Sequence, residues 1–205
     1  RLTDFTVAKP DDDQALRIRT FVEASTAPST HGFRQALESF FAIEGWPYAP
    51  TDVAEVLQTR YGGRTTDWVC LAEIREPGHQ LVFYSLVPER GPADRFPEIC
   101  EYITRANFGL AIGNFELDMH DGEIRYKTSI DVEGATITPA MVKQIVHANV
   151  IVTGLYLPGL LAVISGELSA TEAIGLAEPP GKSEQNAAEP HIGISARLSE
   201  APVER

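Results

Sequence analysis

The chain has 205 residues, 43% of them hydrophobic, and carries 17 basic against 29 acidic side chains, a formal net charge of -12. This length supports one domain with an ordinary hydrophobic core and is short for two. The acidic balance argues against nucleic acid as a partner, because phosphate binding depends on clustered Lys and Arg. We therefore expect one acidic domain that does not bind nucleic acid.

The two ends of the chain differ in composition from its middle. Residues 1–30 mix the acidic run Asp11 to Asp13 with short apolar groups and end in small polar residues, which is typical of an N-terminal extension or linker. Residues 177–205 combine prolines with small polar residues and no aromatic side chain, so we expect a disordered tail. The folded domain is then expected over residues 31–176. No leader-like segment opens the chain, so the expected location is the cytoplasm.

The first predicted helix follows the extension. Ser29 or Thr30 can cap it, and Gly45 with Pro47 can end it. Between these signals, apolar residues recur at helical spacing: Phe33, Ala36, Leu37, Phe40 and Phe41. A weaker strand signal runs from residue 53 to residue 64 and ends in a turn at 61–63.

Two strands are predicted from residue 68 to 75 and from 80 to 87, with Pro77 and Gly78 as the turn. That turn sets the pairs Ile74 with Leu81, Ala72 with Phe83, Cys70 with Ser85, and Trp68 with Val87. The opposite face is also apolar, since Glu73 lies there among Val69, Leu71, Val82, Tyr84 and Leu86. A sheet with one solvated face would be mostly polar at those positions, so we expect a helix or another subunit to cover it.

A helix and a second hairpin follow. Pro92 and Asp94 open the helix, Asn107 with Gly109 can end it, and its apolar face contains Phe96, Ile99, Cys100 and Ile103. Asp121-Gly122 then predicts a two-residue hairpin turn. The predicted register sets Met119 opposite Ile124, Asp118 opposite Arg125, Leu117 opposite Tyr126, and Glu116 opposite Lys127.

The last helix is predicted to start with Thr138 as its cap and Pro139 at its first position, and to end at Gly166. Residues 145–164 contain no Asp, Glu, Lys or Arg, so hydropathy alone would predict a membrane span. Polar residues, glycines and Pro158 argue instead for two shorter buried or interface helices, with breaks near Gly154 and before Pro158. A further short helix is expected over 169–174. The predicted order is therefore helix, three strands, helix, two strands, helix, an antiparallel α+β fold.

No catalytic, cofactor-binding or metal-binding site is predicted. Asp118, His120 and Asp121 resemble a metal or acid–base cluster, but a turn and a cross-strand arginine account for them better. His147 lacks a partner ligand at helical spacing, and no phosphate loop or nucleophile elbow is present. Cys70 and Cys100 fall in phase with apolar residues, so both are expected to be reduced core thiols.

Several short motifs resemble those of the YbjN family, whose members are described as bacterial sensory transduction regulators. They are residues 81–88 (Leu-Val-Phe-Tyr-Ser-Leu-Val-Pro), 105–107 (Arg-Ala-Asn), 113–118 (Gly-Asn-Phe-Glu-Leu-Asp) and 122–127 (Gly-Glu-Ile-Arg-Tyr-Lys). The resemblance covers about residues 33–176. It implies a fold like that of type III secretion chaperones, small α+β proteins that often dimerise and bind partly unfolded partners.

The sequence thus favours a non-enzymatic regulatory or chaperone-like module that forms a homodimer and binds a protein partner without a cofactor. The residues expected to mediate partner binding or self-association are Val150, Ile151, Leu155, Leu157, Leu160, Tyr84 and Leu86. Two alternatives stay open: a membrane-associated regulator anchored by residues 145–164, and an enzyme with an unrecognised carboxylate site.

Overall fold

A computed structural model of the chain describes residues 31–64, 66–75, 78–133 and 135–178. Its elements, in chain order, are α2 (His31–Glu44), β1 (Tyr48–Pro50), β2 (Val56–Gly62), β3 (Asp67–Arg75), β4 (Gln80–Leu86), the 3-10 turn η2 (Ala93–Arg95), α3 (Phe96–Gly109), β5 (Asn114–Leu117), β6 (Ile124–Asp131), α4 (Pro139–Ser165) and α5 (Ala170–Ala177). The α+β class is confirmed. The expected extension, residues 1–30, lies outside the described residues, as do residues 179–205 of the expected tail.

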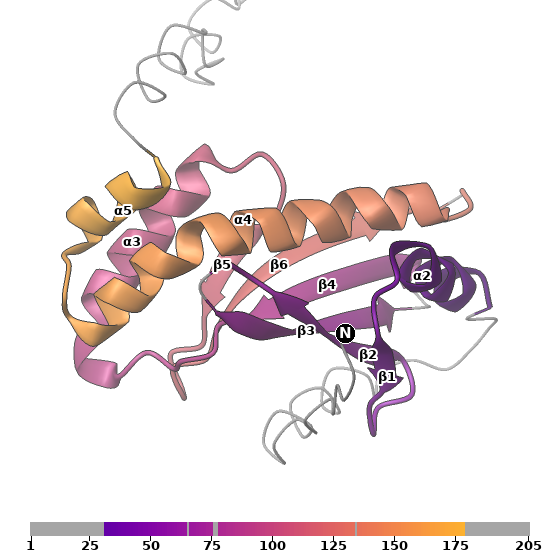
Figure 1. Cartoon of the computed structure of the whole chain (residues 1–205), viewed down its shortest axis with the longest axis horizontal. Helices are drawn as coiled ribbons and strands as arrows, with labels where there is room; N and C mark the ends of the chain where they lie inside the picture. The colour runs from indigo at the N-terminus through magenta and orange to yellow at the C-terminus, as the bar shows by residue number, and fades with distance from the viewer. Residues whose placement is uncertain (1–30, 65, 76–77, 134, 179–205) are drawn as a thin grey trace, which may run out of the picture.

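Six antiparallel strands form one sheet in the order β1-β2-β3-β4-β6-β5. Figure 1 shows α4 running along one face of this sheet, with α2 near one end and α3 and α5 packed together at the other. The main hydrophobic core lies between these helices and the sheet, and each of the four helices contributes residues to it. The molecule therefore has two layers over the described ranges.

The predicted register of the β3–β4 hairpin is confirmed for three of its four pairs. Ile74 lies opposite Leu81, Ala72 opposite Phe83, and Cys70 opposite Ser85. The fourth pair, Trp68 with Val87, does not form, because β4 ends at Leu86. The Trp68 indole instead donates a hydrogen bond to the Ser85 hydroxyl at 2.8 Å. The turn residues 76 and 77 lie outside the described residues.

The predicted register of the second hairpin is wrong by two residues. Leu117 lies opposite Ile124 and Glu116 opposite Arg125, so Met119 is 60% exposed in the loop. Gly122 explains the difference. It adopts a φ of +78° and packs on Gly91, whose amide donates to the Gly122 carbonyl at 2.8 Å, so it serves a contact between loops rather than a tight two-residue turn. A shift of two keeps each residue on its face, so Phe115 and Tyr126 remain in the core.

The weak strand signal over residues 53–64 corresponds to one strand, β2 (Val56–Gly62). β2 begins at Val56, after a turn in which the Val56 amide donates to the Val53 carbonyl at 3.0 Å. The sequence reading missed β1, which is three residues long and ends in Pro50. Ser29 and Thr30, the expected caps of α2, lie outside the described residues.

The end signals of α4 are confirmed, but the predicted breaks inside it are wrong. The Thr138 side chain accepts a hydrogen bond from the Met141 amide, and Gly166 ends the helix at a φ of +81°. Between them α4 is one helix of 27 residues with Pro158 inside it. Gly159 serves close packing instead, because a Cβ there would lie 2.7 Å from both the α5 backbone and the hydroxyl of Tyr102 in α3. Gly154 is exposed, and a Cβ there would make only an ordinary contact with the Trp68 ring, at 3.5 Å.

Helix α4 is long and apolar enough to cross a membrane, and half of its most apolar window is buried inside the protein. Its buried side faces the sheet. There the Asn149 side chain donates to the Phe83 and Tyr126 carbonyls at 3.0 and 3.2 Å and accepts from the Ser85 hydroxyl at 2.6 Å. A polar side chain that bonds to two strands in this way fixes the helix to the sheet.

Candidate functional site

The sheet carries a second hydrophobic cluster on the face turned away from the described helices. Its members come from strands β2 to β4 and from the turn before β2. The buried apolar residues of α2, α3, α4 and α5 belong to the first cluster. The second cluster consists of Val53, Val56, Leu71, Val82, Tyr84 and Leu86, with Val69 packed against it. The predicted second apolar face is therefore present, and its apolar residues are buried except Val69, which is partly buried.

A charged network lies in the middle of this second face. The Glu73 side chain belongs to a residue that is 6% exposed and stands opposite Val82 in the β3–β4 ladder. Its carboxylate accepts two hydrogen bonds from Arg75, with Nε–Oε1 at 2.7 Å and Nη2–Oε2 at 3.1 Å, and one from the Tyr84 hydroxyl at 3.1 Å. A buried carboxylate is costly without partners, so this closed set of bonds is what keeps Glu73 stable among apolar residues.

A second group of charges comes from β5 and β6. Arg125 lies over the Tyr84 ring, with its guanidinium carbon 4.6 Å from the ring centroid. Arg125 also donates from Nε to Glu116 at 2.8 Å, and Lys127 forms an ion pair with the same carboxylate. The pairing of strands brings these groups together, since Glu116 is opposite Arg125 and Tyr84 is opposite Lys127. Cations from β3 and β6 thus flank the apolar centre of the face.

The pKa shifts in this network favour its charged, hydrogen-bonded state. Burial by itself would raise the pKa of Glu116, but hydrogen bonds from Lys127 and Arg125 outweigh burial and lower it. Burial, reinforced by the charge of Glu73, raises the pKa of the Tyr84 phenol. Burial would lower the pKa of Arg75, but its bonds to Glu73 prevail and raise it. None of these shifts moves a group toward neutral pH, where general acid–base catalysis operates.

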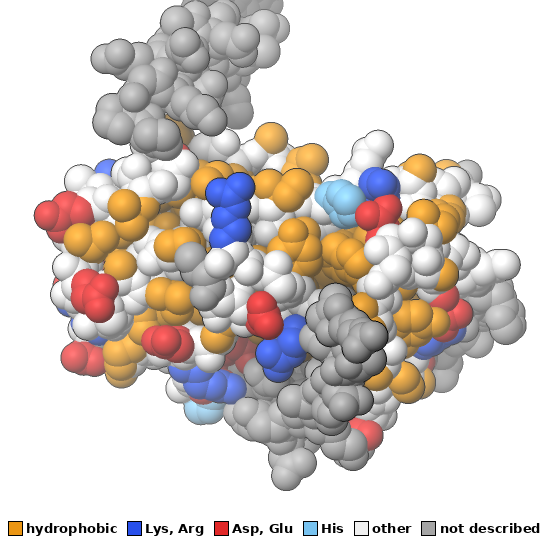
Figure 2. Space-filling model, viewed as in Figure 1, with side chains coloured by type: hydrophobic (Ala, Val, Ile, Leu, Met, Phe, Trp, Pro, Cys, Tyr) orange, Lys and Arg blue, Asp and Glu red, His pale blue; other side chains and the backbone are white. Residues whose placement is uncertain are grey.

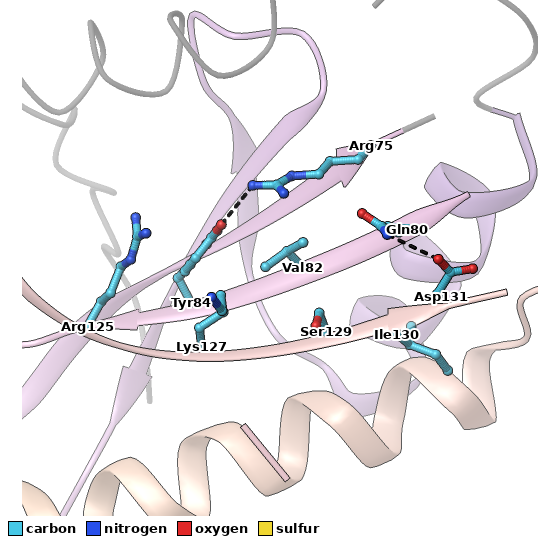
Figure 3. A pocket seen from close by; sticks show the side chains of 9 residues that line it. All are labelled: Arg75, Gln80, Val82, Tyr84, Arg125, Lys127, Ser129, Ile130 and Asp131. Carbon is cyan, nitrogen blue, oxygen red and sulfur yellow. Dashed lines mark hydrogen bonds between the residues drawn. The ribbon is translucent and has the colours of Figure 1, made fainter. Parts of the chain in front are cut away.

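A cavity of about 180 Å³ opens on the same face between β3, β4 and β6. Its lining residues are Arg75, Gln80, Val82, Tyr84, Arg125, Lys127, Ser129, Ile130 and Asp131. Figure 3 shows Arg75, Tyr84 and Arg125 projecting from the side of the strands opposite the helix that runs beneath them. The cavity is therefore smaller than an ordinary small-molecule site, which has a volume of roughly 300–1,000 Å³.

The residues predicted for partner binding or self-association are not gathered on one surface. Three of them are buried in the first cluster: Val150, Leu157 and Leu160. Ile151 and Leu155 are 63% and 49% exposed on the outer side of α4, where Figure 2 shows hydrophobic side chains at the surface. Tyr84 and Leu86 belong to the second cluster, on the opposite face of the sheet. The predicted residues thus divide among the main core, the outer side of α4 and the second face of the sheet.

The polar residues weighed for chemistry have structural partners. The Asp118 carboxylate accepts from the His120 amide at 2.8 Å, and Asp121 accepts from the Glu123 amide at 3.0 Å and pairs with Arg90. Within the described ranges, no group of three or more His, Cys, Asp or Glu is arranged to hold a metal ion. These loop residues therefore shape the turn between β5 and β6.

His147 belongs to a small cluster where α4 passes α2. Its Nε2 atom lies 3.2 Å from Glu44, its ring stacks on Trp46 at 6.2 Å, and Glu44 also binds Lys143 at 2.8 Å. His147 therefore has structural partners in α2 and in the loop that follows it. The cluster fixes α2 to α4.

The two cysteines are free thiols in different surroundings. Cys70 is fully buried, and burial raises the pKa of its thiol to about 12, against the smaller opposing effect of hydrogen bonds with Ser85 and Trp68. Cys100 is only half-buried, so its assignment to the core is wrong. It lies at the edge of the apolar face of α3, beside residues that turn to solvent.

The sequence reading missed the role of Arg75, Arg125 and Lys127 in the site. Each residue was visible in its own hairpin, but the network depends on β4 pairing with β6 across the intervening α3. One available signal was Glu73 at an otherwise apolar position, since a buried carboxylate requires a nearby cation. The two-residue spacing of Glu73 and Arg75 on one strand face satisfies that requirement.

The fold and the site define a two-layer α+β protein with a charged network set into an apolar sheet face. The YbjN family model, described as "Putative bacterial sensory transduction regulator", matches residues 34–160, more than half of the chain. The chain belongs to the YbjN family. A comparison with curated proteins finds no match.

Two solved structures are similar to the chain at low sequence identity. The crystal structure of YbjN from E. coli, described as "a putative transcription regulator", matches with a TM-score of 0.49 and 12% identity, over 63% of this chain and 90% of that chain. The structure of the HopA1-SchA chaperone-effector complex matches with a TM-score of 0.42 and 16% identity, over 69% of this chain and 97% of that chain. This distant match is the finding that bears on the expected likeness to type III secretion chaperones.

Proposed function

We propose that this chain is a non-enzymatic regulatory module that binds a protein segment on the second face of its sheet. The observation that carries the proposal is the second hydrophobic cluster, which lies apart from the main core and surrounds a charged network. Membership of a family described as regulators supports it. The segment bound would supply aliphatic or aromatic side chains to the cluster and a carboxylate to the cations at its border.

The arrangement of charges favours polypeptide recognition over catalysis. The cations Arg125 and Lys127 lower the pKa of Glu116, which is the opposite of the raised pKa that a carboxylic general acid needs. The cavity at the site has the size of a side chain, and apolar centres with charged borders are the usual composition of protein interfaces. These features support binding of a partner through side-chain burial, and a carboxylate of the partner would join Glu116 between Arg125 and Lys127.

A peptide array tests this function directly. The purified full chain is applied to immobilised 15-residue peptides that vary independently in aliphatic content and in Asp and Glu content. We expect binding to the peptides that combine both features. Leu86→Ala should weaken it by roughly tenfold, because a buried aliphatic side chain at an interface contributes about 1–2 kcal/mol. Lys127→Gln should weaken it by roughly two- to fivefold and only for acidic peptides.

Two matched substitutions on the helical side serve as controls. Ile43→Ala removes an aliphatic side chain of a residue that is 74% exposed on α2, and Lys143→Gln removes a cation from α4. Neither should change binding. Two results would reject the second face as the binding site: an equal loss of peptide binding in the control variants, or peptide binding that is unchanged by Leu86→Ala and Lys127→Gln. Thermal unfolding of each variant separates lost binding from lost structure.

A further inference from the structure

The second face is buried although the described helices all lie on the other side of the sheet. Leu71, Val82 and Tyr84 are 6%, 3% and 6% exposed. Their described neighbours in the second cluster are residues of the strands and of the turn before β2. Side chains on a central strand pair stay partly exposed when nothing packs over them, so this face requires a cover. These exposed fractions belong to one chain without a partner, so the cover is sought in the parts of the same chain outside the described ranges.

Residues 1–30 have the chemistry that this face requires. They contain the apolar residues Leu16, Ile18, Phe21 and Val22 within seven positions, with Arg17 and Arg19 among them. The acidic run Asp11 to Asp13 ends three residues before Leu16. The face offers an apolar cluster bordered by Arg75, which pairs with Glu73, and by Arg125 and Lys127, which share Glu116. The apolar residues of the segment thus match the apolar cluster, and its acidic run matches the side of the face where two cations, Arg125 and Lys127, share one carboxylate.

The segment is also long enough to reach the face. It connects to α2 at His31, on the helical side of the sheet. Thirty residues span up to roughly 100 Å when extended, whereas the 27-residue α4, which runs along the sheet, is about 40 Å long. A chain of this length can pass around an edge of the sheet and cross its second face. The connection to α2 therefore sets no limit on docking.

The C-terminal residues 179–205 match the face less well. They contain four prolines and no aromatic residue, and their glutamates stand singly at 184, 189, 200 and 204. Such a segment offers neither a cluster of large apolar side chains nor a run of carboxylates. The N-terminal segment is the better occupant on both counts.

We propose that residues 1–30 fold back over the second face of the sheet in the same molecule. The group from Leu16 to Val22 covers the second cluster, and Asp11 to Asp13 lie toward Arg125 and Lys127. The consequence for partner binding rests on the proposed function: the segment occupies the partner site and competes with the partner. The chain then carries its own inhibitor of binding, which a partner must displace.

Site-specific photo-crosslinking in the full chain tests the docking. Phe21→p-benzoylphenylalanine places a photoreactive aromatic group in the apolar part of the segment, and the variant is mixed in light and ¹⁵N-labelled forms before irradiation. We expect crosslinks within single molecules to peptides that contain residues 69–75 or 80–86. Links between light and heavy chains would show that a second copy covers the face, and links confined to the helices would place the segment elsewhere. Either result overturns the proposal. The same group at Ile43 on α2 is the control.

A second measurement tests competition. Asp11→Asn, Asp12→Asn and Asp13→Asn together should tighten binding of acidic, apolar peptides by roughly three- to tenfold, because each partly exposed ion pair is individually weak. If no crosslinks to the second face form while peptide binding still depends on Leu86, the fold-back is overturned and the proposed function stands. Crosslinks to the face without any peptide binding would uphold the fold-back and remove the proposed function.

Discussion

Two side chains, Glu73 and Asn149, show how this protein accommodates polar groups in apolar surroundings. Glu73 is held in the second face by Arg75 and Tyr84, whereas Asn149 is held in the main core by two strand carbonyls and the Ser85 hydroxyl. In both cases, several bonds converge on one group from different strands. Loss of a partner therefore leaves a buried donor or acceptor unsatisfied, which costs more than the bond itself contributes.

Asn149→Leu should destabilise the fold by about 2–4 kcal/mol, since it removes the donor for two buried carbonyls and the acceptor for Ser85. Urea unfolding followed by circular dichroism measures this change. Gln144→Leu on the exposed side of the same helix is the matched control and should change stability by less than about 0.5 kcal/mol. Equal stability of Asn149→Leu and the wild type would show that the network is dispensable.

Glu116 should contribute stability that depends on pH. Its pKa is lowered in the fold by Lys127 and Arg125 against the effect of burial, so folding favours the ionised form. The contribution is therefore complete above the ordinary carboxyl pKa of about 4.3 and is lost as the pH falls through the lowered folded value. Glu116→Gln should cost about 1 kcal/mol at pH 7, after allowance for solvent screening of this partly exposed pair.

Unfolding curves of both forms from pH 7 to pH 2.5 measure that contribution. The difference between Glu116→Gln and the wild type should shrink below about pH 4, as the wild-type carboxylate takes up its proton. A difference that stays constant over the whole range would assign the effect to packing rather than to charge.

At the scale of elements, the turns determine which predictions succeed. The β3–β4 register follows from alternating strands and a Pro-Gly turn, and its three confirmed pairs need no other part of the chain. The β5–β6 register depends on the contact of Gly122 with Gly91, which lies 31 residues earlier and cannot be read from the hairpin itself. Gly154 and Pro158 suggested breaks in α4 for a similar reason, since the contacts along this helix, such as Gly159 against Tyr102, are tertiary and leave no local signal.

Gly122→Ala should therefore destabilise the protein by at least about 2 kcal/mol, because the residue has a φ of +78° and an added Cβ would meet the Gly91 carbonyl oxygen at 2.1 Å. Gly175→Ala is the matched control. Gly175 lies in α5 with nothing within 4 Å of a Cβ, so alanine there should stabilise by up to about 1 kcal/mol. Thermal melts of both variants measure the contrast, and a neutral Gly122→Ala would refute the loop contact.

At the scale of the whole molecule, the order of strands builds the site. Tyr84 meets Arg125 only because β4 pairs with β6, and helix α3 with β5 separates these strands in the sequence. Local patterns predict which face of each strand is apolar but not which strands become neighbours. The residues of the site could thus be found one by one, while their assembly required the fold.

The homodimer expected from the sequence stays a prediction, and the outer side of α4 is where an interface could use exposed apolar residues. Light scattering after size exclusion over a concentration series should give twice the chain mass of 22.4 kDa. Ile151→Asp should return the mass to that of one chain, because a charge would enter the apolar contact around Leu155. Ile43→Asp on α2 should leave it unchanged. A monomer at every concentration would remove this interface.

The outermost strands of the sheet restrict how any other polypeptide can join it. β1 has three residues and ends in Pro50, and β5 at the opposite border has four residues. Proline has no amide hydrogen to donate, and so short a border exposes few free backbone groups as a template for a further strand. Growth of the sheet by strand addition, whether with a client peptide or in an aggregate, is therefore disfavoured. An incoming chain must be recognised by its side chains rather than by its backbone.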